Sequence, residues 1–224
     1  MALPIALQAW PGLRLWLCPL HDAPDDAQQS WLDAVEHARA ARFVYEIRRR
    51  RYLAAHVALR SLLGAALGQA PHALRIEPDA NDKPRLVGHA GWQFNLSDSD
   101  DWALVGLQQG APIGVDVEVR RTLDDARALA NRLYTPPERE AVFDAAEGPE
   151  REAAFLRVWT RKEACLKAVG LGLRLAPSSF EAGAHDGEAV ARLVTPDGPV
   201  DVQVVSLPTG IDAFAAVARV IGPA

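Results

Sequence analysis

Hydrophobic and polar residues alternate strictly over residues 113–118, and this stretch is the most informative pattern in the chain. Branched apolar residues occupy its odd positions and Gly114, Asp116 and Glu118 its even ones, which predicts a half-buried strand. Asp116 and Glu118 then project from one face, roughly 7 Å apart along the strand. Such a pair repels unless a proton or a cation intervenes. The face is therefore either a solvated acidic surface or a site for a hard cation such as Mg²⁺, and we expect Gly114 to let a ligand approach the backbone.

Apolar periodicity elsewhere predicts alternating helical and extended segments. Residues 21–29 read as a polar loop with Ser30 as the following N-cap, and Thr135 and Glu138 have the spacing of a capping box. The predicted helices are 31–42, 48–67, 126–133, a short one after Thr135, and 151–170. The predicted strands are 13–18, 74–77, 92–99, 102–107, 113–118, 200–206 and 211–220.

The two halves of the chain resemble each other weakly. Each has a helix of about 20 residues that ends in glycine and is accompanied by short strands. The turn at 108–112 is the natural division, which gives an N-terminal subdomain over 1–111 and a C-terminal subdomain over 112–224. We therefore predict an α+β fold of two pseudo-symmetric subdomains, each a small, mainly antiparallel sheet on a long helix, with the active site in the cleft between them.

The helix predicted over 151–170 carries the second group of candidate residues. Its apolar side chains fall on one arc, and Glu163 and Lys167, spaced i and i+4, lie on the flank of that arc. These two residues are either an ordinary surface ion pair or part of a site. Lys162 falls inside the apolar arc, so its ammonium must reach out to solvent or meet an anion.

Composition limits the classes of protein that this chain can represent. With 224 residues and a formal net charge of −5, bulk electrostatics do not favour nucleic acid or an anionic membrane. Cys18 and Cys165 lie far apart and match no metal-binding spacing, which is typical of a reduced, cytoplasmic protein. The first 20 residues contain prolines and Arg14 and lack a basic leader, so we expect neither a signal peptide nor a membrane span there.

Two further polar groups have open interpretations. The run 48–51 is four arginines, which form either a solvated helix face or a phosphate-binding cluster. Ser97 and Ser99 share one face of their strand, where their hydroxyls either bind phosphate oxygens or face solvent. Only Lys83, Lys162 and Lys167 are lysines in a chain whose other basic residues are all arginines, which singles out these three positions.

Four blocks of sequence, in order, resemble those of a 4′-phosphopantetheinyl transferase of the surfactin-synthetase-activating type. The blocks are Asn-Asp-Lys-Pro at 81–84, Phe-Asn-Leu-Ser-Asp-Ser at 94–99, Ile-Gly-Val-Asp-Val-Glu at 113–118, and Trp-Thr-Arg-Lys-Glu-Ala-Cys-Leu-Lys at 159–167. The last block, followed by Gly-Leu-Gly-Leu, is the most specific. The resemblance extends from about residue 39 to residue 180.

The resemblance implies that phosphopantetheine is transferred from coenzyme A to a serine of an apo acyl or peptidyl carrier protein, with release of 3′,5′-ADP. It implies Mg²⁺ on Asp116, Glu118 and Glu163, with Lys167 at the diphosphate. Glu163, acting directly or through a metal-bound water, is our first candidate for the base. The resemblance further implies coenzyme A contacts from the following residues: Arg39, Arg51, Lys83, Pro84, Ser97, Asp98, Lys162 and Lys167.

Position 98 departs from the family pattern. Members of the family usually have His in this block, and here the residue is Asp98. An ionised carboxylate cannot donate a hydrogen bond to a phosphate and repels it. Either Asp98 points away or pairs with an arginine, or coenzyme A is held differently in this protein.

Two alternatives to the transferase remain. One is a catalytically silent module that binds coenzyme A or a carrier protein on the same fold, for which Asp98 is the only support. The other is a nucleic-acid binder that uses the arginine run 48–51, although the chain has the wrong net charge and no aromatic stacking motif. From the resemblance we also expect a monomer.

Overall fold

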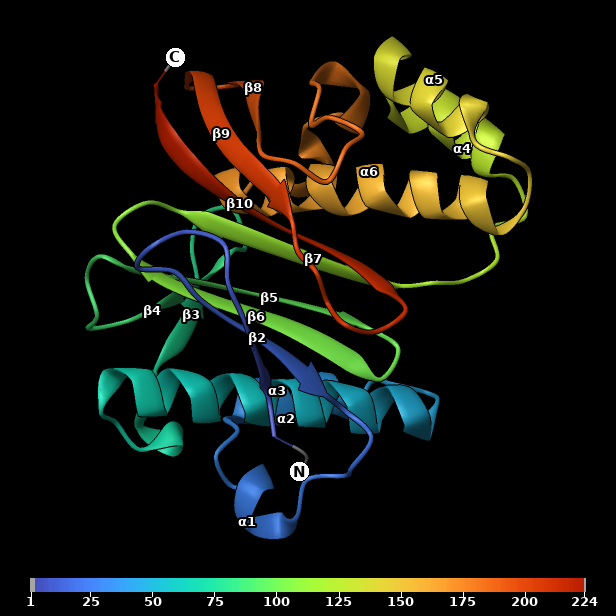
Figure 1. Cartoon of the computed structure of the whole chain (residues 1–224). Coiled ribbons are helices and arrows are strands. Elements are labelled where there is room, and N and C mark those ends of the chain that lie inside the picture. The colour runs from blue at the N-terminus through green and yellow to red at the C-terminus, as the bar shows by residue number, and fades with distance from the viewer. Residues whose placement is uncertain (1–2, 224) are drawn as a thin grey trace.

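A computed structural model describes residues 3–223. It has an α+β architecture of antiparallel sheets and helices, which confirms the predicted fold class (Figure 1). The helices are α1 (Asp26–Gln29), α2 (Ala34–Ala40), α3 (Glu46–Leu67), α4 (Ala126–Leu133), α5 (Pro136–Asp144) and α6 (Pro149–Val169). The strands are β1 (Ile5–Leu7), β2 (Arg14–Pro19), β3 (Ile76–Pro78), β4 (Pro84–Leu86), β5 (Trp92–Ser99), β6 (Trp102–Gln109), β7 (Ile113–Val119), β8 (Ala189–Thr195), β9 (Gly198–Ser206) and β10 (Ala213–Pro223).

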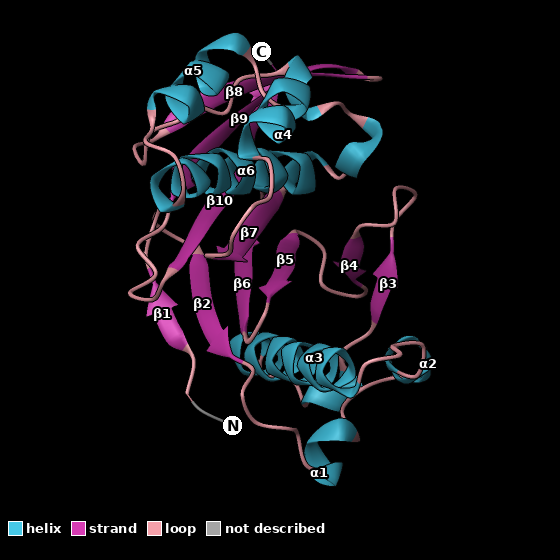
Figure 2. Ribbon diagram, turned by 90° about the vertical axis from the view of Figure 1, so that its right-hand side faces the viewer, coloured by secondary structure: helices cyan, strands magenta, loops and turns pink. Residues whose placement is uncertain are grey.

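Two four-stranded sheets form the centre of the molecule. The first has the order β1-β2-β6-β5 and the second β7-β10-β9-β8, and β3 pairs with β4 in a separate hairpin. All of these pairings are antiparallel. Figure 2 shows β2, β5, β6 and β7 between α3 and α6, while β8 and β9 extend past α6 and α4 and α5 lie beside that helix. The division into subdomains at residue 111 stays a prediction.

Each long helix covers one sheet with small and branched apolar side chains. The α3 helix packs Ala55, Leu59 and Leu63 against β5 and β6, and α6 packs Ala164 and Leu166 against the second sheet. Both helices end at a glycine in the left-handed conformation, Gly68 and Gly170, as the sequence predicts.

A third apolar cluster, which we call the inter-sheet core, joins the two sheets. It is formed by residues from both halves of the chain: Trp10, Leu15, Leu17, Leu104, Val115, Val117, Leu207, Ala215 and Val217. Side chains on the odd-numbered face of 113–118 therefore belong to a core that both sheets share, which explains why that face carries only branched apolar residues. None of the helices described between residues 3 and 223 is long and apolar enough to cross a membrane.

Several local predictions were wrong. The expected loop 21–29 contains α1, and the strands β1 and β8 were not foreseen. The N-cap of α2 is Asp33 and not Ser30, because the Asp33 carboxylate accepts hydrogen bonds from the backbone of Val35 and Glu36 while Glu36 bonds back to Asp33. This capping box starts the helix three residues later than predicted.

Candidate active site

The even face of β7 lies directly on the backbone of α6. A methyl group added at Gly114 would be 2.1 Å from the carbonyl oxygen of Ala164 and 2.4 Å from the nitrogen of Ala168. Our expectation that Gly114 leaves room for a ligand was wrong, since the helix itself fills this space. The glycine instead allows the strand and the helix to approach closely, which brings their polar side chains to one place.

Asp116 is the most buried of these polar side chains, with 4% of its surface exposed. Its Oδ1 accepts hydrogen bonds from Ser97 Oγ at 2.8 Å and from Lys167 Nζ at 2.6 Å. Its Oδ2 is buried and has no hydrogen-bond partner among the described residues. Burial raises the pKa of Asp116, and the Lys167 ammonium opposes that effect. A buried carboxylate oxygen left unpaired is costly and marks the place where a positive ligand would be stabilised.

Glu118 is anchored by three side chains. Its Oε1 accepts a hydrogen bond from Trp159 Nε1 at 3.1 Å, and its Oε2 accepts from Ser99 Oγ at 3.1 Å. The guanidinium of Arg121 lies 2.6 Å from the same Oε2. Trp159, which stacks on Phe155, therefore also orients a candidate metal ligand.

Glu163 faces the same centre from α6. Burial, followed by the nearby charges of Asp116 and Glu118, raises the pKa of Glu163 to about 7, although Lys167 acts in the opposite direction. The three carboxyl groups are thus close enough to perturb one another. The ion pair of Lys167 is made with Asp116 and not with Glu163, so the i, i+4 spacing does not describe an ordinary surface pair.

The donor set of this centre fits a hard divalent cation. Among residues 3–223 no three or more His, Cys, Asp or Glu side chains are already gathered as a metal cluster. Asp116, Glu118 and Glu163 nevertheless supply only carboxylate oxygens, and one of these, Asp116 Oδ2, is buried without a partner. Oxygen donors and mutual repulsion are what an ion such as Mg²⁺ neutralises.

A cavity of about 910 Å³ opens on the opposite side of β5, between that strand and α2, α3 and the β3–β4 hairpin. Four of the residues expected to contact coenzyme A line it: Arg39, Arg51, Pro84 and Asp98. Ser97 is the neighbour of Asp98 on β5 but faces Asp116 and Lys167. The cavity and the carboxylate centre therefore lie on opposite faces of β5, because successive side chains of a strand point to opposite sides.

Lys83 joins the two halves of the chain. Its Nζ donates hydrogen bonds to the carbonyl oxygens of Ile113 and Ala168, each at 2.9 Å. Burial lowers the pKa of Lys83 to about 8. The ammonium is thus directed at the junction of β7 and α6, while Pro84 beside it lines the cavity.

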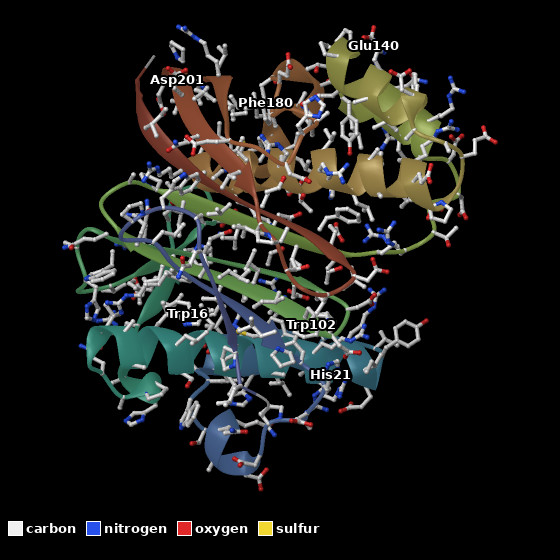
Figure 3. The ribbon with its side chains drawn as sticks, in the orientation of Figure 1. Trp16, His21, Trp102, Glu140, Phe180 and Asp201 are labelled. Atoms are coloured by element: carbon white, nitrogen blue, oxygen red, sulfur yellow. The ribbon has the colours of Figure 1, made fainter. Side chains whose placement is uncertain are left out.

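Lys162 is not brought to the cavity or to the carboxylate centre. Its side chain is fully buried and pairs with the Glu138 carboxylate at 2.7 Å. Its Nζ also donates to the carbonyl oxygens of Pro177 and Phe180, at 2.8 and 2.6 Å. Figure 3 shows Phe180 on the side of α6 that faces away from α3. Of the two alternatives that the sequence left for this lysine, solvent or an anion, the structure has the anion, which is Glu138.

The sequence of this chain matches those of known protein families. A sequence model described as the 4′-phosphopantetheinyl transferase superfamily matches residues 112–214, and one for the N-terminal part of 4′-phosphopantetheinyl transferases matches residues 24–109. The 4′-phosphopantetheinyl transferase HetI of Nostoc sp. is 36% identical over 167 residues, which cover 72% of this chain and 70% of HetI. The protein psf-1 of Bacillus pumilus, also named a 4′-phosphopantetheinyl transferase, is 33% identical over 77% of this chain and 72% of its own length.

The chain belongs to the 4′-phosphopantetheinyl transferase superfamily. The resemblance seen in the four sequence blocks is thereby confirmed, as is the expectation of a transferase enzyme. The surfactin-synthetase-activating subtype stays a prediction.

Three polar residues of this phosphopantetheinyl transferase were not predicted to shape the centre. Ser99 and Arg121 bind Glu118, and Asn95 Oδ1 accepts a hydrogen bond from the backbone nitrogen of Val115 at 2.9 Å. Asn95, Ser97 and Ser99 alternate on one face of β5, and that face turns out to meet β7. The period-two pattern of small polar residues was the signal, but it did not reveal which partner strand they would face.

Proposed function

We propose that this protein transfers the 4′-phosphopantetheine group of coenzyme A to a serine of an apo acyl or peptidyl carrier protein and releases 3′,5′-ADP. The observation that carries the proposal is the meeting of Asp116, Glu118, Glu163 and Lys167 at the contact of β7 and α6, within a chain of this superfamily. The adjacent cavity, lined by Arg39, Arg51 and Pro84, supports a nucleotide site on the other side of β5.

In the proposed reaction the serine hydroxyl oxygen attacks the phosphorus that carries pantetheine. A new serine O–P bond forms, the bond from that phosphorus to the bridging oxygen of the diphosphate breaks, and 3′,5′-ADP leaves with the bonding electrons. Cleavage of a diphosphate depends mainly on positioning and on neutralising charge. The serine proton passes to Glu163, whose carboxylate faces the same centre from α6.

Asp116, Glu118 and Glu163 would hold Mg²⁺, which when bound neutralises the diphosphate oxygens. The chain's own residues prepare that site. Trp159 and Ser99 hold the Glu118 carboxylate in place. Lys167 extends to the same centre, where its ammonium is available to stabilise the charge that develops on the leaving diphosphate oxygen.

The proposed setting is a monomer in a reducing cytoplasm. Cys18 and Cys165 are both free thiols and both buried, which agrees with a compartment where disulfides do not form. Coenzyme A and the carrier protein are the proposed partners.

Intact mass spectrometry of an apo carrier protein tests the proposal. The carrier is incubated with this protein, coenzyme A and Mg²⁺. Transfer of one phosphopantetheine group should raise the mass of the carrier by roughly 340 Da. The gain should be lost with Glu163→Gln and with EDTA. Glu150→Gln, an exposed acid at the start of the same helix, is the matched control and should react normally. Failure with several carriers despite measured coenzyme A binding would favour the catalytically silent module.

A further inference from the structure

The cavity proposed for the nucleotide carries an excess of negative side chains. Three arginines line it: Arg39, Arg48 and Arg51. Six carboxylates line it as well: Asp33, Glu36, Glu77, Asp82, Asp98 and Asp100. A phosphate monoester brings nearly two further negative charges at neutral pH. Asp33 and Glu36 are paired with Arg60, and Glu77 with Arg75, whereas Asp100 is paired with Arg51 of the cavity wall itself.

Arg51 is already held by carboxylates of its own chain. Its Nε donates to Asp101 Oδ1 at 2.9 Å, and its Nη1 donates to Asp100 Oδ1 at 3.1 Å. Arg50 approaches the same Asp101 oxygen at 2.8 Å. Asp101 and Asp100 thus each accept one of the guanidinium hydrogen bonds that a ligand phosphate would otherwise use.

The geometry of the β5–β6 turn places these carboxylates. Ser99 pairs with Trp102, so Asp100 and Asp101 are the two residues of the loop. Asp100 has φ of 49°, the left-handed conformation that Asp and Asn tolerate better than other side chains. His21 packs edge-on against Trp102 with ring centroids 5.6 Å apart, and Figure 3 shows both beside one end of α3. The turn is therefore anchored against the first turns of the helix that carries Arg51.

Asp98 adds a further negative charge at the cavity wall. It lies two residues before the loop, on the cavity side of β5, and its side chain is exposed. A phosphate that bound Arg51 would compete with Asp100 and Asp101 and would lie in the cavity that Asp98 also lines. Negative side chains close to a bound phosphate weaken its binding.

We propose that the β5–β6 turn is a specificity-determining element of the coenzyme A site. Asp100 and Asp101 act as a built-in substitute for a ligand phosphate on Arg51, and Asp98 reinforces them. The enzyme consequently gains little affinity from the 3′-phosphate of coenzyme A and uses 3′-dephospho-coenzyme A about equally well. This inference rests on the proposed function, because it concerns the donor substrate of the same site.

Equilibrium binding of two nucleotides that differ only in this phosphate tests the inference directly. For the wild-type protein we expect 3′,5′-ADP and 5′-AMP to bind with dissociation constants within about threefold of each other, far less than a charge-assisted phosphate contact provides. The values of kcat/KM for coenzyme A and 3′-dephospho-coenzyme A should agree to the same degree.

Substitutions in the turn should restore a preference. Asp101→Asn keeps a side chain that accepts from Arg51 but removes the charge, and we expect the preference for the 3′-phosphate to rise about tenfold. Asp100→Asn and Asp98→Asn, at exposed positions, carry the test if Asp101→Asn does not fold. Asp197→Asn, in the exposed β8–β9 turn, changes the net charge equally and should leave the preference unchanged.

The possible outcomes separate the inference from the proposed function. Transfer from both donors at similar rates supports both. If kcat/KM for coenzyme A exceeds that for 3′-dephospho-coenzyme A by more than about tenfold, the inference alone is overturned, because the 3′-phosphate then binds in spite of the turn carboxylates. A folded Asp101→Asn protein with unchanged preference also overturns it. If the protein neither binds these ligands nor transfers from them, both the inference and the proposed function are overturned.

Discussion

The ammonium of Lys162 lies 2.7 Å from the carboxylate of Glu138 although the two side chains are only 0% and 1% exposed. Glu138 caps α5 through Thr135 and also accepts a hydrogen bond from the backbone of Ala182 at 2.8 Å. One ion pair therefore joins α6 to α5 and to the segment after α6. This network holds the helix from the side opposite the carboxylate centre.

Glu138→Gln should destabilise the protein strongly. The amide keeps the shape of the side chain but leaves Lys162 as a buried charge without a counter-ion, which costs about 3–5 kcal/mol. Urea unfolding measures the difference. Glu140→Gln, on the exposed side of the same helix (Figure 3), is the matched control and should change stability by less than about 0.5 kcal/mol. Equal stability of the two variants would contradict a structural role for the pair.

Gly114→Ala should separate β7 from α6. The added methyl group would lie 2.1 Å from the carbonyl oxygen of Ala164 and 2.4 Å from the nitrogen of Ala168. Both are backbone atoms, so neither can rotate away. We expect a loss of about 1–3 kcal/mol in the free energy of unfolding and a fall in kcat, since Asp116 and Glu163 would move apart. At Gly187 an added methyl group meets nothing within 4 Å, so Gly187→Ala should behave as wild type in both measurements.

In EDTA, Glu163 should make stability depend on pH. Its pKa is raised in the folded protein to about 7, so between the ordinary value of 4.5 and 7 the folded state binds more protons than the unfolded state. The stabilisation from this group is complete below the ordinary pKa and is lost as the pH rises through 7. Glu163→Gln should therefore gain stability relative to wild type between pH 5 and pH 8, by about 2–3 kcal/mol. A constant difference would show that Glu163 is not perturbed.

Both cysteine thiols should resist modification in the folded protein. Burial raises the pKa of Cys18 and of Cys165 to about 12, and the thiolate is the form that reacts. Ellman's reagent at pH 8 should detect no rapidly reacting thiol in buffer and both thiols in guanidinium chloride. A fast-reacting thiol in the native protein would contradict the packing of β2 or α6, which carry these residues.

Asp98→His should lower the KM for coenzyme A. The change removes a negative charge from the cavity wall and adds a hydrogen-bond donor beside Arg51. The KM for 3′-dephospho-coenzyme A should change less, since that donor lacks the monoester. If the KM for coenzyme A is unchanged or raised, position 98 does not face the phosphates.

The sequence predicted best where one physical rule acted alone. Strict alternation located β7, and helical periodicity with a terminal glycine located α3 and α6 within a few residues. Local hydrogen bonding was less predictable, because Asp33 and Ser30 are both acceptable N-caps, and the start of the helix is decided by the capping box of Asp33 with Glu36, a residue that Arg60 also binds.

The candidate site was predicted in part for the same reason. Spacing placed Asp116 and Glu118 on one face, yet no spacing rule shows that Gly114 faces a helix or that Lys162 meets Glu138, because both depend on elements distant in sequence. Likewise the arginine run gave no indication that Arg50 and Arg51 would be held by Asp101. Long-range pairing decides these outcomes.

The inter-sheet core bears on how such a chain can be recombined. Leu15, Leu17 and Leu104 from the first half pack against Val115 and Val217 from the second within one apolar cluster. The two halves are therefore not exchangeable modules, however alike they look in outline. In a chimera that joins residues before 111 to the corresponding second half of a relative, the two sides of the inter-sheet core come from different proteins. Whether such a chimera folds will depend on how well those side chains pack together and not on the choice of linker.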